Sequence, residues 1–265
     1  MLASLVPRLI CPNCRSSIRI ESVSDGSVDA MVAGKLACAG CDAIFPVERG
    51  IARMMPKSIL DAQKDEIQAR DAQVAQYDAN SFLNFFGRFE IPMTLARLDL
   101  GATNLLLEGG CGTGRMTPTF AARVREQVSI DFSFESLCAA KLKADKAGLR
   151  NVHFVQADLC NLPLADSLFD RVVSCQVLEH VPGGEARDQA VRSLGRVAGP
   201  GARVVVSAYR HSALMGAKQG RHAGGIPFFR FTRREFADLL GAEFEIESLT
   251  GSLIYLWLAK GFRRG

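Results

Sequence analysis

Residues 105–115 read LLLEGGCGTGR. The apolar run at 105–107 is typical of a buried parallel strand, and the glycine-rich turn behind it predicts a loop that opens the next helix. Gly110, Gly112 and Gly114 would let the backbone pass close to a ligand where a side chain would collide. In an open α/β sheet, a turn of this kind holds a nucleotide-like cofactor outside the carboxyl ends of the strands.

Three acidic residues follow three successive predicted strands. Glu108 ends the first apolar run, Asp131 follows residues 128–130, and Asp158 comes just after residues 152–155. Because parallel strands of one sheet end at the same edge, we expect the three carboxylates to lie along that edge.

The spacing of the glycines separates two classes of cofactor. A dinucleotide site reads G-x-G-x-x-G, with a pyrophosphate at the start of the helix. This chain reads G-x-G-x-G, with Glu108 two positions before the first glycine. A carboxylate there would repel a pyrophosphate but could accept hydrogen bonds from an ammonium group. The pattern favours S-adenosylmethionine, which has an amino-acid end, a ribose and an adenine but no phosphate; a nucleotide-dependent oxidoreductase is the alternative.

The chain resembles the class I S-adenosylmethionine-dependent methyltransferases, and within them the branch called methyltransferase type 11. The resemblance covers roughly residues 100–260. The matching segments are 108–114, 129–133, 157–159, 161–170, 177–181 and 199–202. It implies a Rossmann-like α/β fold, with a seven-stranded, mostly parallel sheet whose final strand is antiparallel. Residues 243–249 and 253–260 are the expected last two strands.

The resemblance also implies the contacts of the cofactor. Glu108 and the glycines would border the methionine end, Asp131 would bind the ribose hydroxyls, and Asp158 with Leu159 would flank the adenine. The expected cofactor-binding residues are Glu108, Gly109, Gly110, Gly112, Gly114, Asp131, Phe132, Asp158, Leu159 and Gln176.

Four cysteines near the amino terminus form two C-x-x-C pairs: Cys11 with Cys14, and Cys38 with Cys41. Two such pairs predict a tetrahedral structural zinc site, although the intervening segment is slightly longer than the usual spacing of about 15–20 residues. Unmetallated thiols and a redox dithiol are the alternatives. The first 55 or so residues resemble a small zinc-ribbon-like domain that also occurs as an independent activator subunit of methyltransferases.

The length and composition of the chain limit the number of domains that it can contain. The 265 residues are 48% hydrophobic, enough for a large core and one small extra domain. We expect a zinc-ribbon-like domain at 1–56, a helical connector or lid at 57–100 and the methyltransferase domain at 101–265. The stretch 1–10 lacks the apolar core of a signal peptide, and no apolar run is long enough to span a bilayer, so a cytoplasmic location is expected.

The connector is predicted to be helical from Ser58 to Ala79, with Ser58 and Asp61 as a capping box. In related methyltransferases the segment before the first strand covers the cofactor, so Tyr77 is expected to close the site. An aromatic group follows it and would either extend this lid or anchor the connector on the core. Its members are Phe82, Phe85, Phe86 and Phe89.

The stretch 189–234 contains no Asp or Glu but nine Lys and Arg residues. Its segment 209–231 should emerge at the cofactor edge of the sheet, where it could bind an anionic acceptor. A solvated basic surface is the alternative. His180, His211 and His222 are candidates for a general base by their location.

The acceptor class is open at this point. The leading hypothesis is a small molecule, anionic or lipid-like. A base in ribosomal or transfer RNA is the runner-up, because one group of ribosomal RNA methyltransferases also joins a cysteine-rich zinc module to this fold. The net charge of +4 is too mild to indicate nucleic acid by itself. A scaffold that binds the cofactor and activates a partner without catalysis is the third hypothesis.

Overall fold

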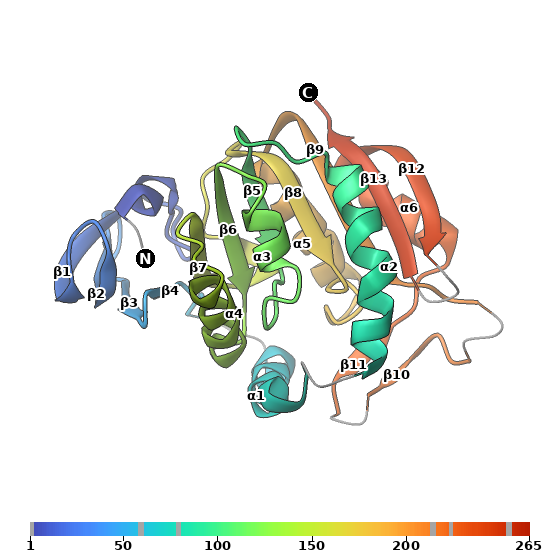
Figure 1. Cartoon of the computed structure of the whole chain (residues 1–265), viewed down its shortest axis with the longest axis horizontal. Coiled ribbons are helices and arrows are strands. Elements are labelled where there is room, and N and C mark those ends of the chain that lie inside the picture. The colour runs from blue at the N-terminus through green and yellow to red at the C-terminus, as the bar shows by residue number, and fades with distance from the viewer. Residues whose placement is uncertain (1–2, 58–60, 78–80, 213–215, 223–224, 253–255) are drawn as a thin grey trace.

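One mixed sheet runs through the chain in the computed structural model, which describes residues 3–57, 61–77, 81–212, 216–222, 225–252 and 256–265. The strand order within the described residues is β1-β2-β3-β4-β7-β6-β5-β8-β9-β13-β12 (Figure 1). A separate two-stranded hairpin, which the sequence did not predict, consists of β10 (Gln219–Arg221) and β11 (Pro227–Phe229).

The carboxyl-terminal part of the sheet matches the expected Rossmann-like architecture. Five strands pair in parallel: β7 (Val152–Gln156), β6 (Glu126–Asp131), β5 (Leu105–Gly109), β8 (Phe169–Cys175) and β9 (Ala198–Tyr209). The last strand, β13 (Leu256–Arg263), is antiparallel to both β9 and its other neighbour β12 (Phe244–Ser252). These seven strands confirm the predicted sheet and its antiparallel final strand.

The amino-terminal part extends this sheet, so the strand count is larger than the predicted seven. The meander comprises β1 (Ile18–Gly26), β2 (Met31–Cys38), β3 (Ile44–Glu48) and β4 (Ile51–Arg53), preceded by the 3-10 helix η1 (Ala3–Arg8). β4 pairs in parallel with β7, placing Ile51 opposite Phe154. Without β4, strand β7 would be an edge with unpaired backbone groups. The predicted domain boundaries remain a prediction.

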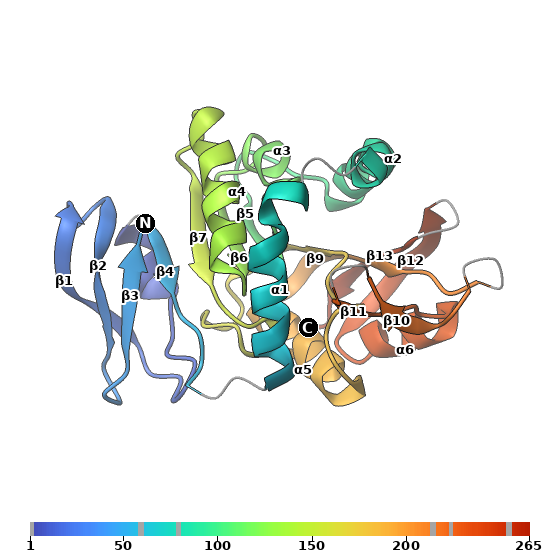
Figure 2. The same cartoon turned by 90° about the horizontal axis from the view of Figure 1, so that it is seen from below.

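Helices cover both faces of the sheet (Figure 2). One face carries α2 (Ser81–Leu98), α3 (Thr117–Ala121) and α4 (Phe134–Lys146), and the other carries α5 (Gly184–Val197) and α6 (Arg233–Gly241). The short helix η2 (Leu159–Asn161) follows β7. No helix in the described ranges is long and apolar enough to cross a membrane.

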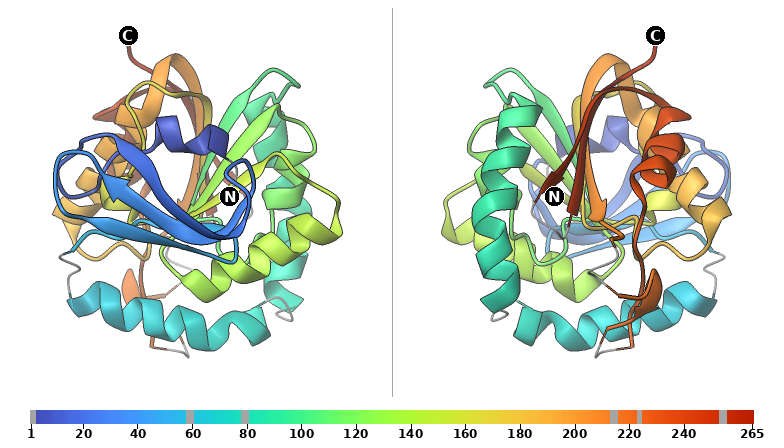
Figure 3. Two further views of the ribbon diagram at one scale, coloured as in Figure 1. Left: turned by 90° about the vertical axis from the view of Figure 1, so that its left-hand side faces the viewer. Right: turned by 90° about the vertical axis from the view of Figure 1, so that its right-hand side faces the viewer.

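Helix α1 (Asp61–Tyr77) runs across the edge of the sheet where the parallel strands end (Figure 3). It confirms the predicted helical connector. Ser58, the side chain of Tyr77 and the side chains of Phe82, Phe85 and Phe86 lie outside the part of the structure that is described. Phe89 is 43% exposed, so it does not anchor the connector by burial.

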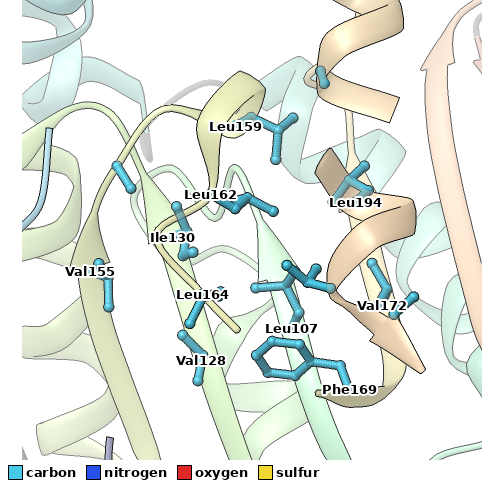
Figure 4. Close-up of a cluster of buried hydrophobic side chains, with 14 of the residues drawn as sticks. Leu107, Val128, Ile130, Val155, Leu159, Leu162, Leu164, Phe169, Val172 and Leu194 are labelled. Carbon is cyan, nitrogen blue, oxygen red and sulfur yellow. The ribbon is translucent and has the colours of Figure 1, made fainter. Parts of the chain in front are cut away.

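The apolar run at 105–107 explains why β5 is central. Leu107 packs on one face of the sheet against Val128, Phe169 and their neighbours (Figure 4). Leu106 belongs to a second cluster with Phe120 and residues of β8, β9 and β13. Successive side chains of a strand point to opposite faces, so a run without polar residues fits a strand that is covered on both sides.

Candidate functional site

A cavity of about 890 Å³, open to solvent, lies at the carboxyl ends of β5, β6 and β8. The glycine-rich turn, the carboxylates that end β5 and β6, and helix α1 all contribute to its wall. Among the lining residues are Arg70, Glu108, Gly112, Asp131, Gln176 and His180. The structure therefore brings residues from 70 to 180 together at the predicted edge.

The three alternating glycines have different roles. All have positive φ, at +77°, +53° and +77° for Gly110, Gly112 and Gly114. A Cβ added to Gly110 would lie 2.2 Å from the Val177 side chain, and one on Gly114 would lie 2.8 Å from Cα of Ala140. A Cβ on Gly112 would meet no atom within 4 Å. Of the three, Gly112 alone faces open space; the other two are required by packing.

Glu108 is buried at the end of β5 and is 5% exposed. Its Oε2 accepts hydrogen bonds from Thr117 Oγ1 at 2.6 Å, Gln127 Nε2 at 2.8 Å and Ser129 Oγ at 2.9 Å. No donor among the described residues reaches Oε1. Burial raises the pKa of Glu108 to about 7, against the lowering effect of these hydrogen bonds. A cationic ligand beside Oε1 would favour the charged form.

Asp131 ends β6 on the opposite side of the glycine turn. Its Oδ2 accepts a hydrogen bond from the Gly112 N–H at 2.8 Å, and its Oδ1 accepts one from Ser133 N–H at 2.9 Å. Burial raises the pKa of Asp131, and the two backbone hydrogen bonds oppose that shift. Each carboxylate oxygen can accept a second hydrogen bond, so the fixed carboxylate can still receive a pair of ligand hydroxyls.

A second, more apolar cavity of about 460 Å³ adjoins the first. Asp158 and Leu159 line it, and Phe132, Val177 and His180 line both cavities. Asp158 also accepts a hydrogen bond from the Cys160 N–H at 2.9 Å, which caps η2. The two cavities adjoin along the same edge of the sheet. The part at the end of β5 is polar, and the part at the segment that follows β7 in the sequence is apolar.

Of the ten residues expected to bind cofactor, Gly109 and Gly114 line neither cavity. Gly109 is packed inside the sheet, where an added Cβ would lie 2.9 Å from the Leu159 side chain. Gln176 lines the first cavity, with φ at +58°, but its Nε2 donates to Glu90 at 2.6 Å. The other seven line one cavity or both.

The sequence reasoning missed a buried carboxylate on α2. Glu90 is 1% exposed and accepts hydrogen bonds from Arg115 at 2.8 Å, from Gln176 and from Ser207 Oγ at 2.9 Å. Arg115 and Gln176 both line the first cavity, so Glu90 ties α2 to its wall. Two sequence signals pointed toward this network: Gln176 was an expected cofactor-site residue, and Arg115 directly follows the glycine turn.

Helix α1 supplies Arg70, Gln73 and Val74 to the wall of the first cavity. These residues lie opposite the glycine turn, and Asp71 accepts a hydrogen bond from Ser133 Oγ, which follows β6. The expectation of a lid pointed to Tyr77, but it missed Arg70.

The three histidines differ in their positions relative to the two cavities. His180 is 8% exposed and lines both cavities. His222, on the hairpin side, packs against the His180 ring with 5.6 Å between centroids. His211 is held by a backbone hydrogen bond from its N–H to Phe231 O, and it lines neither cavity.

The basic segment makes many internal contacts. Lys218 forms an ion pair with Glu235, and Arg221 donates to Gly225 O. The guanidinium of Arg230 lies 4.4 Å from the centroid of the Phe228 ring. Part of the charge that the sequence suggested for binding an anion is therefore committed to stabilising the hairpin.

The four amino-terminal cysteines lie together, with all four sulfur atoms within 4.8 Å of one another. Sγ of Cys14 is 3.4 Å from that of Cys38, and Sγ of Cys11 is 3.8 Å from that of Cys41. The N–H groups of Asn13 and Gly40 donate to the Cys11 and Cys38 sulfurs. Four sulfurs around a metal at about 2.3 Å would be about 3.8 Å apart in a tetrahedron, close to these distances.

Comparison with known proteins agrees with this geometry. The family model described as "Methyltransferase domain" matches residues 107–206, which begin within β5 and end within β9. Residues 107–206 therefore match a methyltransferase domain. That domain contains the glycine turn and the three strand-end carboxylates; α1 and the cysteine cluster lie outside it.

Two curated relatives match the region of the methyltransferase domain. Methyltransferase GfsG of Streptomyces halstedii is 34% identical over 113 residues, covering 42% of this chain and 40% of that protein. The demethylmenaquinone methyltransferase of Thermobifida fusca (strain YX) is 29% identical over 160 residues, covering 59% of this chain and 66% of that protein. Both matches span less than two thirds of the relative.

Among solved structures, the DhpI-SAH complex superposes with a TM-score of 0.62 at 22% identity, covering 78% of this chain and 99% of that one. At this identity the likeness shows the fold alone. It supports the Rossmann-like assignment for the methyltransferase domain.

Proposed function

We propose that the protein binds S-adenosylmethionine along the described edge and transfers its methyl group to a small-molecule acceptor. The main support for the proposal is that Glu108 and Asp131 line the same cavity as Gly112, where an added Cβ would meet no atom within 4 Å. Glu108 would accept a hydrogen bond from the ammonium group, Asp131 would hold the ribose hydroxyls, and the cavity beside Asp158 and Leu159 would take the adenine.

When bound, the cofactor supplies a methyl group activated by a positively charged sulfur. The protein then has to align the acceptor and keep water out. Arg70 and Val74 on α1 close the wall opposite the glycine turn, and Glu90 holds Arg115 and Gln176 in place. These residues serve alignment and exclusion of water.

A small-molecule acceptor is favoured over RNA. The relative from Thermobifida fusca is named for a small-molecule methylation. In the basic segment, Lys218 and Arg221 are engaged in internal contacts. An RNA interface would instead be expected to present such cations on one face. A cytoplasmic location remains part of this proposal.

The acceptor class is tested with S-adenosylmethionine that carries a labelled methyl group. The purified protein is incubated with the labelled cofactor and, separately, with total small metabolites and with total RNA from the source cells. We expect label in the metabolite fraction. Label in RNA would contradict the small-molecule proposal and support the runner-up. Cofactor binding without label in either fraction would support the non-catalytic scaffold.

We also propose that the four-cysteine cluster binds a structural zinc ion. The donor set consists of sulfur atoms only, and thiolates are ligands that zinc prefers in structural sites. A metal held by Cys11, Cys14, Cys38 and Cys41 would tie the two C-x-x-C segments of the meander together and stabilise it substantially. Asn161 Nδ2 donates to Pro12 O at 2.6 Å, which joins this cluster to the segment after Asp158.

A further inference from the structure

The imidazole of His180 has a defined orientation at the junction of the two cavities. Its Nδ1 lies 2.8 Å from the carbonyl oxygen of Pro227 on β11. A carbonyl oxygen can only accept, so Nδ1 must carry the hydrogen and donate it. In the neutral ring Nε2 then carries a lone pair. The described residues offer no hydrogen-bond partner to Nε2.

Two further rings hold this imidazole. Tyr209, at the end of β9, packs edge-on with 5.5 Å between centroids and an interplanar angle of 80°. His222 packs against it at 5.6 Å, and His222 is itself 4.8 Å from the ring of Phe228. The contacts with strand β9 and with the β10–β11 hairpin thus hold the His180 ring in place. His180 itself lines both cavities.

We propose that His180 is the general base of the reaction, acting through Nε2, and that the acceptor is a planar ring that carries a phenolic or enolic hydroxyl group. This inference rests on the proposed methyl transfer. The residues around His180 favour an aromatic acceptor: the exposed ring of His222 lies beside His180, the ring of Phe228 lies next to His222, and a flat ring can pack on them.

The surroundings keep His180 neutral. Burial lowers the pKa of His180 well below its usual value, and the positive charge of Arg70 and the neighbouring His222 act in the same direction. Burial also raises the pKa of Glu179, the residue before His180, well above its usual value, which disfavours a negative charge beside the ring. The neutral ring keeps the Nε2 lone pair available to accept a proton while the methyl group is transferred, and this help suffices for an acidic hydroxyl such as a phenol, whereas an alkyl hydroxyl is far too weak an acid.

The step balances without another reactant. The acceptor hydroxyl gives its proton to Nε2 of His180 as an oxygen electron pair forms the bond to the methyl carbon. The bond from that carbon to sulfur breaks, and its electron pair remains on sulfur. His180 then releases the proton to solvent, and Nδ1 keeps its hydrogen bond to Pro227 throughout.

The test compares His180→Asn with wild type on two probes, 4-methoxyphenol and 4-nitrophenol, at pH 8. The first phenol is un-ionised at this pH and needs a base; the second is ionised and does not. We expect the variant to lose roughly 100-fold to 10,000-fold in rate on 4-methoxyphenol and far less on 4-nitrophenol. His211→Asn, outside both cavities, is the matched control and should behave as wild type.

Two readouts do not depend on turnover. Nitrogen NMR of the histidine rings should show His180 with hydrogen on Nδ1, and calorimetry should show binding of S-adenosylhomocysteine to His180→Asn. The role of His180 would be overturned if His180→Asn lost the same factor in rate on both phenols, or lost none on either. It would also be overturned if NMR placed the ring hydrogen on Nε2. Binding of S-adenosylhomocysteine with no wild-type methylation of either phenol would overturn the acceptor class and leave the proposed function standing. Absence of that binding would reject the proposed function itself.

Discussion

Asp131→Ala should weaken the binding of S-adenosylhomocysteine by roughly 100-fold or more, because hydrogen bonds to a charged acceptor are worth about 1.5–3 kcal/mol each and a ribose would make two. The substitution also removes the acceptor of the Gly112 and Ser133 N–H groups. The glycine turn would lose one of its links to β6 and keep those from the Gly110 and Cys111 N–H groups to Ile130 O, so the site would be less ordered before ligand arrives. Calorimetric titration measures the effect.

Asp131→Asn and Asp145→Ala serve as controls for this experiment. Asp131→Asn keeps the shape of the side chain but not its charge, and should bind at an intermediate level. Asp145 lies on α4, where it pairs with Lys141 and touches neither cavity. Asp145→Ala should bind as wild type. Wild-type affinity in Asp131→Ala would remove Asp131 from the ribose role.

Loss of the metal site should unfold the amino-terminal meander. Structural zinc contributes about 10–16 kcal/mol in zinc-finger peptides, more than the total stability of many domains. We expect wild-type protein, purified under reducing conditions, to contain one zinc ion per chain and Cys38→Ser to contain little. Circular dichroism should show loss of the strand signal of β1–β3. Affinity for S-adenosylhomocysteine should also fall, because Asn161 joins the cluster to the adenine side of the site.

Cys138→Ser is the matched control for zinc content. Cys138 is a single, partly buried cysteine on α4, where its sulfur contacts Arg49. This variant should keep the metal and the strand signal. Wild-type protein without zinc, or a Cys38→Ser variant with unchanged metal content, would contradict the ribbon proposal.

The parts of the site that follow a strand were predictable from local sequence. Glu108 and Asp131 each end an apolar run, and parallel strands place such ends together. The cysteine cluster was predictable for a similar reason, since two C-x-x-C pairs leave few other arrangements. In both cases a short motif and a known geometry were sufficient.

Residues that reach the site from helices were not predictable in this way. Arg70 and Glu90 lie on α1 and α2, where no motif marks a position as pointing into a cavity. Strand β4 has three residues, Ile51–Arg53, too few to show a pattern, so its pairing with β7 could not be foreseen. The separate roles of the glycines depend on what packs above them, as Val177 does on Gly110.

Titration calorimetry with S-adenosylhomocysteine and with NAD tests the central claim most directly. We predict one S-adenosylhomocysteine per chain at pH 8, and weaker binding at pH 6. The pKa of Glu108 is raised to about 7, so its carboxylate, the partner of the ligand ammonium, is present above that pH and lost as the pH falls. NAD should not bind. Tight binding of NAD with no binding of S-adenosylhomocysteine at either pH would contradict the account.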